Sequence, residues 1–226
     1  MTTYNLDSTS IHFYPKDFWS ATTHAVGFVL ALNAMPVLLI KASVYGAGMR
    51  ELTAYAVFML SMTLLYGASA AYHSFNVNER VNKVLKIVDH SSIFVLIAGS
   101  YMPVCICGLA SQKAMMLLAF IWLFALSGIA FKILWVTCPR WVSSLIYTCM
   151  GWACVMVIPD MLKSLPRPAF AWLLAGGLFY TVGALIYARK KDLTGIKGFG
   201  NHEIFHLFVL AGSICHFIQA FCFLCV

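Results

Sequence analysis

Seven long apolar runs, separated by short polar segments, form the main pattern of this chain. Each run has about 20 residues, the length that an α-helix needs to cross a hydrocarbon core of roughly 30 Å. The runs are continuous and do not alternate apolar with polar residues in ten-residue segments, as the strands of a membrane barrel do. The pattern therefore predicts an all-α fold, a seven-transmembrane-helix bundle. The expected spans are residues 20–41, 52–73, 88–109, 114–134, 142–162, 168–188 and 204–225.

Composition agrees with a chain that lies mostly in lipid. Of the 226 residues, 62% are hydrophobic and 10% are charged, whereas soluble domains carry about 25% charged residues. The mean hydropathy is +0.85. We expect two parts, a polar N-terminal cytoplasmic segment over residues 1–19 and a single membrane domain over residues 20–226. The first run lacks a convincing small-residue cleavage site after it, so we interpret it as an uncleaved span.

The distribution of Lys and Arg predicts the orientation of the bundle. If the runs cross the membrane in alternation, ten of the 15 basic residues lie on the side of the N-terminus and five on the other side. The positive-inside rule then places the N-terminus in the cytoplasm and the C-terminus outside. The cations are scattered among loops and do not line one face, which argues against a nucleic-acid partner. The ten are Lys16, Arg80, Lys83, Lys86, Lys132, Arg140, Arg189, Lys190, Lys191 and Lys197.

Polar side chains at three of the run ends carry the candidate chemistry. Ser69 and His73 end the second run, and Asp89 begins the third. His202 and His206 begin the seventh. Residues four apart share one face of a helix, and the alternating topology puts all five at the cytoplasmic leaflet. Three imidazoles, a carboxylate and a hydroxyl are a set suited to Zn²⁺ with a bound water.

Each of these residues also has a purely structural explanation. An intramembrane histidine can hydrogen-bond a neighbouring helix, and Ser69 can be a small packing residue. Asp89 can be a carboxylate at a helix N-terminus, stabilised by the helix dipole. The shared depth of His73, His202 and His206 favours the ligand interpretation for these three.

Two polar residues are expected behind the metal ligands or in a cavity wall. Glu203 completes the string His-Glu-Xaa-Xaa-His of zinc proteases. It lies about 100° around the helix from His202 and therefore points away from a site between the two histidines. His24, one turn inside the first run, lies at the same depth as the candidate site.

Two further histidines are expected outside the site. His90 follows Asp89 and should face a different way. His216 lies ten residues beyond His206, roughly 15 Å deeper at helical rise, and is expected to line a cavity that leads to the site.

Four sequence blocks, in their order and spacing, resemble those of a known family. The blocks are Thr23-His24-Ala25-Val26-Gly27; Ser69-Ala70-Ala71-Tyr72-His73; Asp89-His90-Ser91-Ser92-Ile93 with Ala98-Gly99-Ser100-Tyr101-Met102-Pro103; and His202-Glu203-Ile204-Phe205-His206 with Val209-Leu210-Ala211-Gly212-Ser213. The chain resembles the bacterial hemolysin III proteins, within the progestin and adipoQ receptor family of seven-helix membrane proteins. The resemblance covers nearly the whole chain and implies a multi-pass protein of the bacterial cell membrane.

The resemblance also implies roles for the candidate residues. His73, His202 and His206 would hold a zinc ion, Asp89 would hold or orient a water on it, and Ser69 would stand beside that water. In these residues the family is similar to a wider group of membrane hydrolases that includes the ceramidases.

Three functions are compatible with these observations. The first is a zinc-dependent hydrolase of membrane lipid amides or esters, or a regulator of membrane lipid homeostasis, with membrane lipids as its partners. The second is a receptor-like protein in which the zinc is structural. The third is the pore-forming, cytolytic activity that the family's name implies, although no run carries a repeated polar stripe. The sequence assigns no protein partner.

Overall fold

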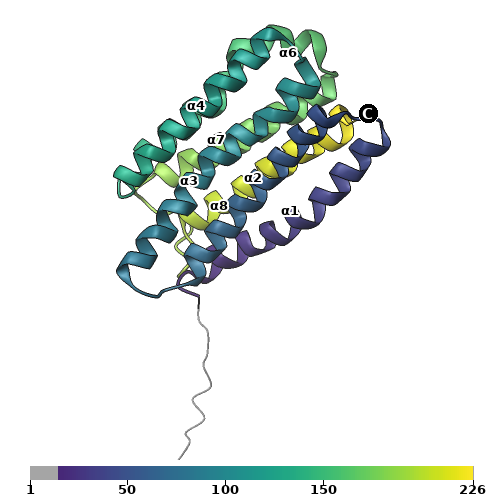
Figure 1. Ribbon diagram of the computed structural model, residues 1–226. Helices are drawn as coiled ribbons and strands as arrows, with labels where there is room; N and C mark the ends of the chain where they lie inside the picture. The colour runs from purple at the N-terminus through teal and green to yellow at the C-terminus, as the bar shows by residue number, and fades with distance from the viewer. Residues whose placement is uncertain (1–14, 226) are drawn as a thin grey trace, which may run out of the picture.

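The computed structural model describes residues 15–225 and is helical, as expected (Figure 1). Seven helical spans within these residues are long and apolar enough to cross a membrane. Most of the predicted polar segment 1–19 lies outside the described residues. The spans are α1 (Phe18–Val44); α2 (Met49–Ser74); α3 (Glu79–Pro103) with a π-helical end (Val104–Leu109); α4 (Gln112–Leu134); α5 (Arg140–Gly151) with a 3₁₀ segment (Trp152–Val157) and α6 (Ile158–Ser164); α7 (Arg167–Ala188); and α8 (Asn201–Gln219) with a π-helical end (Ala220–Leu224).

The spans lie side by side in one bundle (Figure 1). α1 packs along α2, α2 along α3, and α7 along α8, while α8 also contacts α1. Successive spans run in opposite directions, so the start of α1, the end of α2, the start of α3 and the start of α8 meet at one end of the bundle. We call this the histidine end, because it contains His73 and His202.

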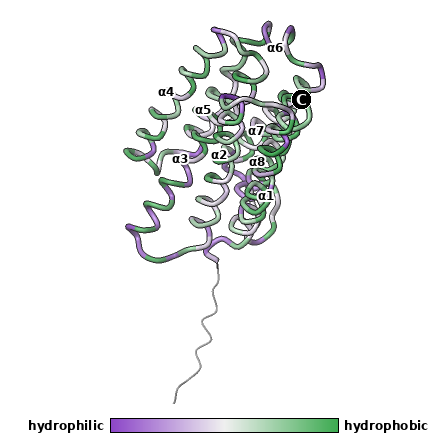
Figure 2. Tube along the Cα trace, turned by 45° about the vertical axis from the view of Figure 1, so that its right-hand side comes forward, coloured by the Kyte–Doolittle hydropathy of each residue, from purple (hydrophilic) through white to green (hydrophobic). Residues whose placement is uncertain are grey.

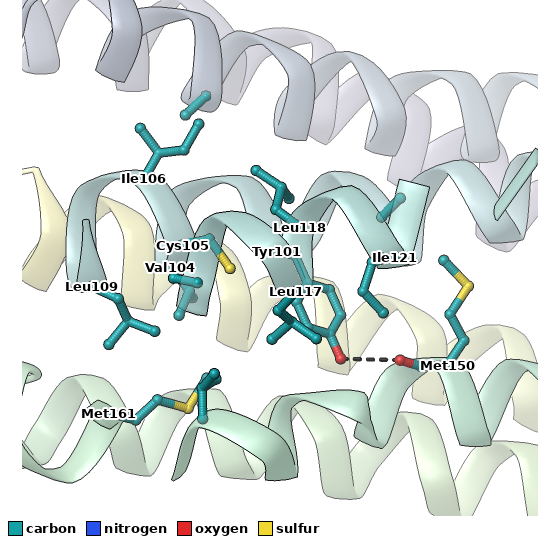
Figure 3. Close-up of a cluster of buried hydrophobic side chains, with 14 of the residues drawn as sticks. Tyr101, Val104, Cys105, Ile106, Leu109, Leu117, Leu118, Ile121, Met150 and Met161 are labelled. Carbon is teal, nitrogen blue, oxygen red and sulfur yellow. Dashed lines mark hydrogen bonds between the residues drawn. The ribbon is translucent and has the colours of Figure 1, made fainter. Parts of the chain in front are cut away.

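Apolar packing between the helices forms two clusters. The first joins α3, α4 and the span from α5 to α6, and includes Phe94 and Ile121. Figure 3 shows part of it around Tyr101, whose hydroxyl donates a hydrogen bond to the Met150 carbonyl oxygen at 3.0 Å. Gly128 lets α4 approach α3, because a Cβ atom there would lie 2.2 Å from the Phe94 ring. The second cluster joins α1, α2 and α8.

The outward surface of the bundle is also apolar. Leu126 on α4 is 60% exposed and Leu185 on α7 is 64% exposed, and Figure 2 shows hydrophobic residues along the outer helices. An apolar surface of this extent is too large for a monomeric soluble protein and fits contact with lipid.

The third helix begins at Glu79, nine residues before the apolar run that predicted it. Asn78 caps it, since its side chain accepts a hydrogen bond from the Val81 amide at 2.9 Å. Such a cap stabilises the start of a helix even where the residues that follow are not buried. Asp89 therefore lies almost three turns inside α3. The helix-dipole explanation of this carboxylate is wrong, because the dipole effect is confined to the first turn.

Candidate metal centre

Three histidines converge at the histidine end of the bundle. His73 lies in the last turn of α2, and His202 and His206 lie in the first two turns of α8. One ring nitrogen from each lies within 4.8 Å of those from the other two, and the Nε2 atoms of His73 and His202 are 3.1 Å apart. The structure thus brings together the three residues that the sequence grouped by depth.

The donor set fits a zinc ion. Zn–N bonds of 2.0–2.1 Å place two nitrogens of a tetrahedral site about 3.3 Å apart, close to the distance between the Nε2 atoms of His73 and His202. Three protein ligands would leave one tetrahedral position for water or substrate, as in catalytic zinc sites. The residues present therefore suit the ion that the resemblance implies.

A small cavity of about 30 Å³ lies beside these rings, and we call it the histidine cavity. Asp89 and Ser69 both line it, together with His24, His202 and His206. Both predicted catalytic side chains are buried, Asp89 at 5% and Ser69 at 1% exposure. The structure places these residues at one cavity, and their catalytic roles stay predictions.

His90 lies closer to the site than expected. It lines the histidine cavity, and its Nε2 atom lies 3.9 Å from Oδ2 of Asp89. Neighbouring helix positions differ by about 100°, less than half a turn, so a side chain as long as imidazole can return to the same cavity. The prediction that His90 faces a different way from Asp89, outside the site, is therefore wrong.

Glu203 holds the start of α8. Its Oε2 atom accepts a hydrogen bond from the Gly200 amide at 2.8 Å, and its Oε1 atom accepts one from the Ser20 hydroxyl at 2.6 Å. The first contact is one half of a capping box, and the second ties α8 to α1. Both carboxylate oxygens are thus engaged in positioning the helix that carries His202 and His206.

Helix α1 lies behind two of the three histidines. Oδ2 of Asp17 is 2.8 Å from Nδ1 of His73, and Oγ1 of Thr23 is 3.3 Å from Nδ1 of His206. The ring of His24 stacks on that of His206 with centroids 3.6 Å apart and an interplanar angle of 7°. The sequence indicated His24 by its depth but gave no indication of Asp17, which is separated from its partner by 56 residues.

Two larger cavities adjoin the histidine cavity. One is an open vestibule of about 700 Å³, lined by His202 and by the basic residues Lys86, Arg140 and Lys190. The other is a mostly apolar cavity of about 130 Å³ between α3, α5, α7 and α8, which we call the apolar cavity. His216 lines it, as expected. Three side chains line both the apolar and the histidine cavity, Tyr147, Tyr187 and Phe205.

Lys132, which the orientation argument counts among the basic residues on the side of the N-terminus, is buried between helices. It lies in the last turn of α4 and is completely buried. Its Nζ atom donates hydrogen bonds to the Ser143 hydroxyl at 2.6 Å and to Sγ of Cys138 at 3.1 Å. Ser143 in turn lines both the histidine cavity and the vestibule, so the buried amino group of Lys132 stands one side chain behind the site.

Lys16 is a second cation near the ligands, outside the membrane spans. Its Nζ atom lies 3.6 Å from the centroid of the Tyr72 ring and 3.9 Å from Oδ2 of Asp17. Partial burial lowers the pKa of Lys16, and the neighbouring Asp17 carboxylate opposes that shift. The Asp17 carboxylate thus lies between His73 and the amino group of Lys16.

Comparison with known proteins places these residues in context. A family model described as Haemolysin-III related matches residues 13–217, a range that includes all four sequence blocks. The chain is 39% identical over 205 residues to Hemolysin-3 of Bacillus cereus, covering 91% of this chain and 90% of that protein. It is 36% identical over 213 residues to the Hemolysin-3 homolog of Bacillus subtilis (strain 168), covering 93% and 95%. It is 22% identical over 225 residues to the Adiponectin receptor protein of Drosophila melanogaster, covering 92% of this chain and 50% of that protein.

Proposed function

Because this chain belongs to the haemolysin III family and is a multi-pass protein of the bacterial cell membrane, we propose that it is a zinc-dependent hydrolase of membrane lipid amides or esters. His73, His202 and His206 would hold the ion. When bound, zinc supplies a Lewis acid that polarises a carbonyl group and makes water more acidic. The observation that carries this proposal is the position of the histidine cavity between an apolar cavity and a polar vestibule.

The apolar cavity suits the acyl chain of a lipid. The surface that its wall exposes is mostly apolar, although serine, threonine, tyrosine and histidine side chains also line it, and it adjoins the histidine cavity at Tyr147 and Phe205. A chain in this cavity would bring its amide or ester carbonyl toward the histidines. The vestibule on the other side would admit water and hold the polar headgroup near Arg140 and Lys190.

Asp89 would carry the proton in this reaction. In amide or ester hydrolysis the water oxygen bonds to the carbonyl carbon, the C–N or C–O bond breaks, and a water proton moves to the leaving nitrogen or oxygen. A buried carboxylate that lines the cavity can accept that proton and return it to the leaving group. The Ser69 hydroxyl, in the same wall, would donate a hydrogen bond to the oxygen on which charge develops.

The orientation with a cytoplasmic N-terminus is part of the proposal. With Lys132 buried, nine basic residues remain on the side of the N-terminus against five on the other side. This bias still favours a histidine end at the cytoplasmic leaflet. A cysteine-accessibility or reporter-fusion assay at the vestibule loop that contains Lys190 tests it, and labelling from the outside would overturn it.

The reaction is tested with zinc-loaded protein in lipid nanodiscs that contain a fluorescent ceramide or a fluorescent ester lipid. Wild type should release the labelled fatty acid, and Asp89→Asn should reduce the rate roughly 10²–10⁴-fold, the usual contribution of a general acid–base group, with zinc retained. Asp160→Asn, the same change in α6, serves as the matched control. Equal rates in wild type and Asp89→Asn, or no release from either lipid, would overturn the hydrolase.

The names of the relatives suggest two other functions for this chain. Two bacterial relatives are called Hemolysin-3 or its homolog, which suggests pore formation and cytolysis. The fly relative is called a receptor, which suggests a receptor-like function for this chain. In that case the zinc would be structural and would tie α2 and α8 together. Dye leakage from liposomes containing the purified protein would favour the pore, whereas tight zinc, sealed liposomes and intact lipids would favour the receptor-like alternative.

A further inference from the structure

Helix α1 contributes none of the three metal-ligating histidines, yet its N-cap residue and its first two turns contact both helices that carry them. The contacting residues are Asp17, Ser20, Thr23 and His24, spaced so that they share one face. We propose that Asp17 and Thr23 are positioning residues that fix the ring orientation and the protonated nitrogen of His73 and His206. This inference rests on the zinc centre of the proposed function.

The contact between Asp17 and His73 determines which ring nitrogen of His73 is free. A carboxylate accepts hydrogen bonds, so at 2.8 Å the Nδ1 atom of His73 is the donor and carries the proton. The other nitrogen, Nε2, then keeps its lone pair, and it is this atom that lies 3.1 Å from Nε2 of His202. The Asp17 amide also donates to the His73 carbonyl oxygen at 3.0 Å, so the side chain and the backbone of Asp17 hold the same residue.

The same reasoning applies to Thr23 and His206. The single hydroxyl proton of Thr23 is directed to the helix carbonyls of Trp19 at 2.9 Å and Ser20 at 3.1 Å. With the proton on either of these shorter contacts, the hydroxyl oxygen accepts at the 3.3 Å contact with His206, and we infer that Nδ1 of His206 is the donor. Nε2 of His206 is then free to bind, and the stacked ring of His24 fixes the plane in which it lies.

A histidine side chain that already has the correct tautomer and orientation binds metal more tightly, because it loses less conformational freedom when the metal binds. Loss of such an outer contact usually weakens metal affinity roughly 10–100-fold. We expect the Zn²⁺ dissociation constant to rise by about that factor in Asp17→Ala and by less in Asp17→Asn, whose amide oxygen still accepts. Thr23→Val, which keeps the side-chain shape, should fall between wild type and Asp17→Ala because its contact is longer.

The experiment is competition for Zn²⁺ between the detergent-purified full-length protein and a chromophoric chelator of known affinity. Glu79→Ala is the matched control, since it removes an exposed carboxylate at the same end of the bundle. Far-UV circular dichroism and metal-free thermal stability are recorded in parallel. Asp17→Ala and Asp17→Asn both keep the backbone bond to His73, so either one that stays helical is informative.

The expected ranking is wild type and Glu79→Ala tightest, then Asp17→Asn, then Asp17→Ala. If folded Asp17→Ala and wild type bind zinc with equal affinity, and only the metal-free stability is lowered, the contact of Asp17 with His73 is purely structural. This result would overturn the inference. Wild type that binds no zinc would also overturn it. The hydrolase proposal is judged separately, because the expected affinity ranking without lipid hydrolysis would support the positioning role and count against the enzyme.

Discussion

Glu203 gives the sharpest test of what the His-Glu-Xaa-Xaa-His string does in this chain. In a zinc protease the glutamate is the general base, whereas here its two oxygens accept from the Gly200 amide and the Ser20 hydroxyl. We therefore expect Glu203→Gln and Glu203→Ala to lower stability and to leave hydrolysis near the wild-type rate.

The magnitude follows from the two contacts. A hydrogen bond contributes about 0.5–1.5 kcal/mol net, and Glu203 is only partly buried, so that solvent screens its charge and each of the two contacts counts as about 1 kcal/mol. Loss of a helix cap costs about 0.5–2 kcal/mol. We expect Glu203→Ala to lower the free energy of unfolding by about 2 kcal/mol, and Glu203→Gln by about 1 kcal/mol because glutamine also suits a capping box.

Thermal unfolding of detergent-purified protein, followed by circular dichroism, measures this effect. For chains of 150–250 residues, 1 kcal/mol corresponds to a Tm shift of about 2–4 °C, so the alanine variant should melt about 4–8 °C below wild type. A general base would behave differently, since its loss lowers the rate roughly 10²–10⁴-fold. A Glu203→Gln protein that keeps its Tm and its zinc but loses hydrolysis on that scale would refute the capping role.

Three further variants test the site, the apolar cavity and the packing. His206→Ala should reduce the zinc content from about one ion per chain to nearly none by elemental analysis, and full retention would exclude this residue as a ligand. Gly177→Leu adds a side chain to the wall of the apolar cavity, at a position where a Cβ atom meets nothing within 4 Å. This variant should slow hydrolysis of long-chain lipids more than hydrolysis of short-chain lipids. An equal effect on both would place the acyl chain elsewhere. Gly128→Ala forces a methyl group against the Phe94 ring and should destabilise the fold by about 1–3 kcal/mol, seen as a lower Tm with unchanged zinc affinity; an unchanged Tm would show that α3 and α4 can separate without cost.

The spans were predictable because each is a continuous apolar run of the correct length, and residues 15–225 contain seven of them. The start of α3 was not, because the segment from Glu79 to Val88 is polar and amphipathic, and helix there depends on the Asn78 cap and on helix-forming charged residues. A hydropathy criterion predicts that a helix ends where the apolar run ends. Helix α3 extends beyond its apolar run, to Glu79.

The histidine cluster was predictable from topology alone, since the end of the second span and the start of the seventh must lie on the same side of a membrane. Its surroundings were not. The contact between Asp17 and His73 depends on how the start of α1 meets the end of α2, which no sequence spacing encodes. Lys132 was counted with the basic residues on the side of the N-terminus, and its burial beside two polar side chains could not be predicted from its charge.

The three histidines of the cluster lie far apart in the chain, at residue 73 and at residues 202 and 206. Chains are synthesised from the N-terminus, so Asp17 and His73 are made long before Asn201. A product that terminates before α8 has one of the three histidines and cannot complete the cluster. Bound metal would then be found only in full-length protein whose last span has inserted in the correct direction. The zinc content after purification would therefore distinguish mature protein from truncated or misinserted chains.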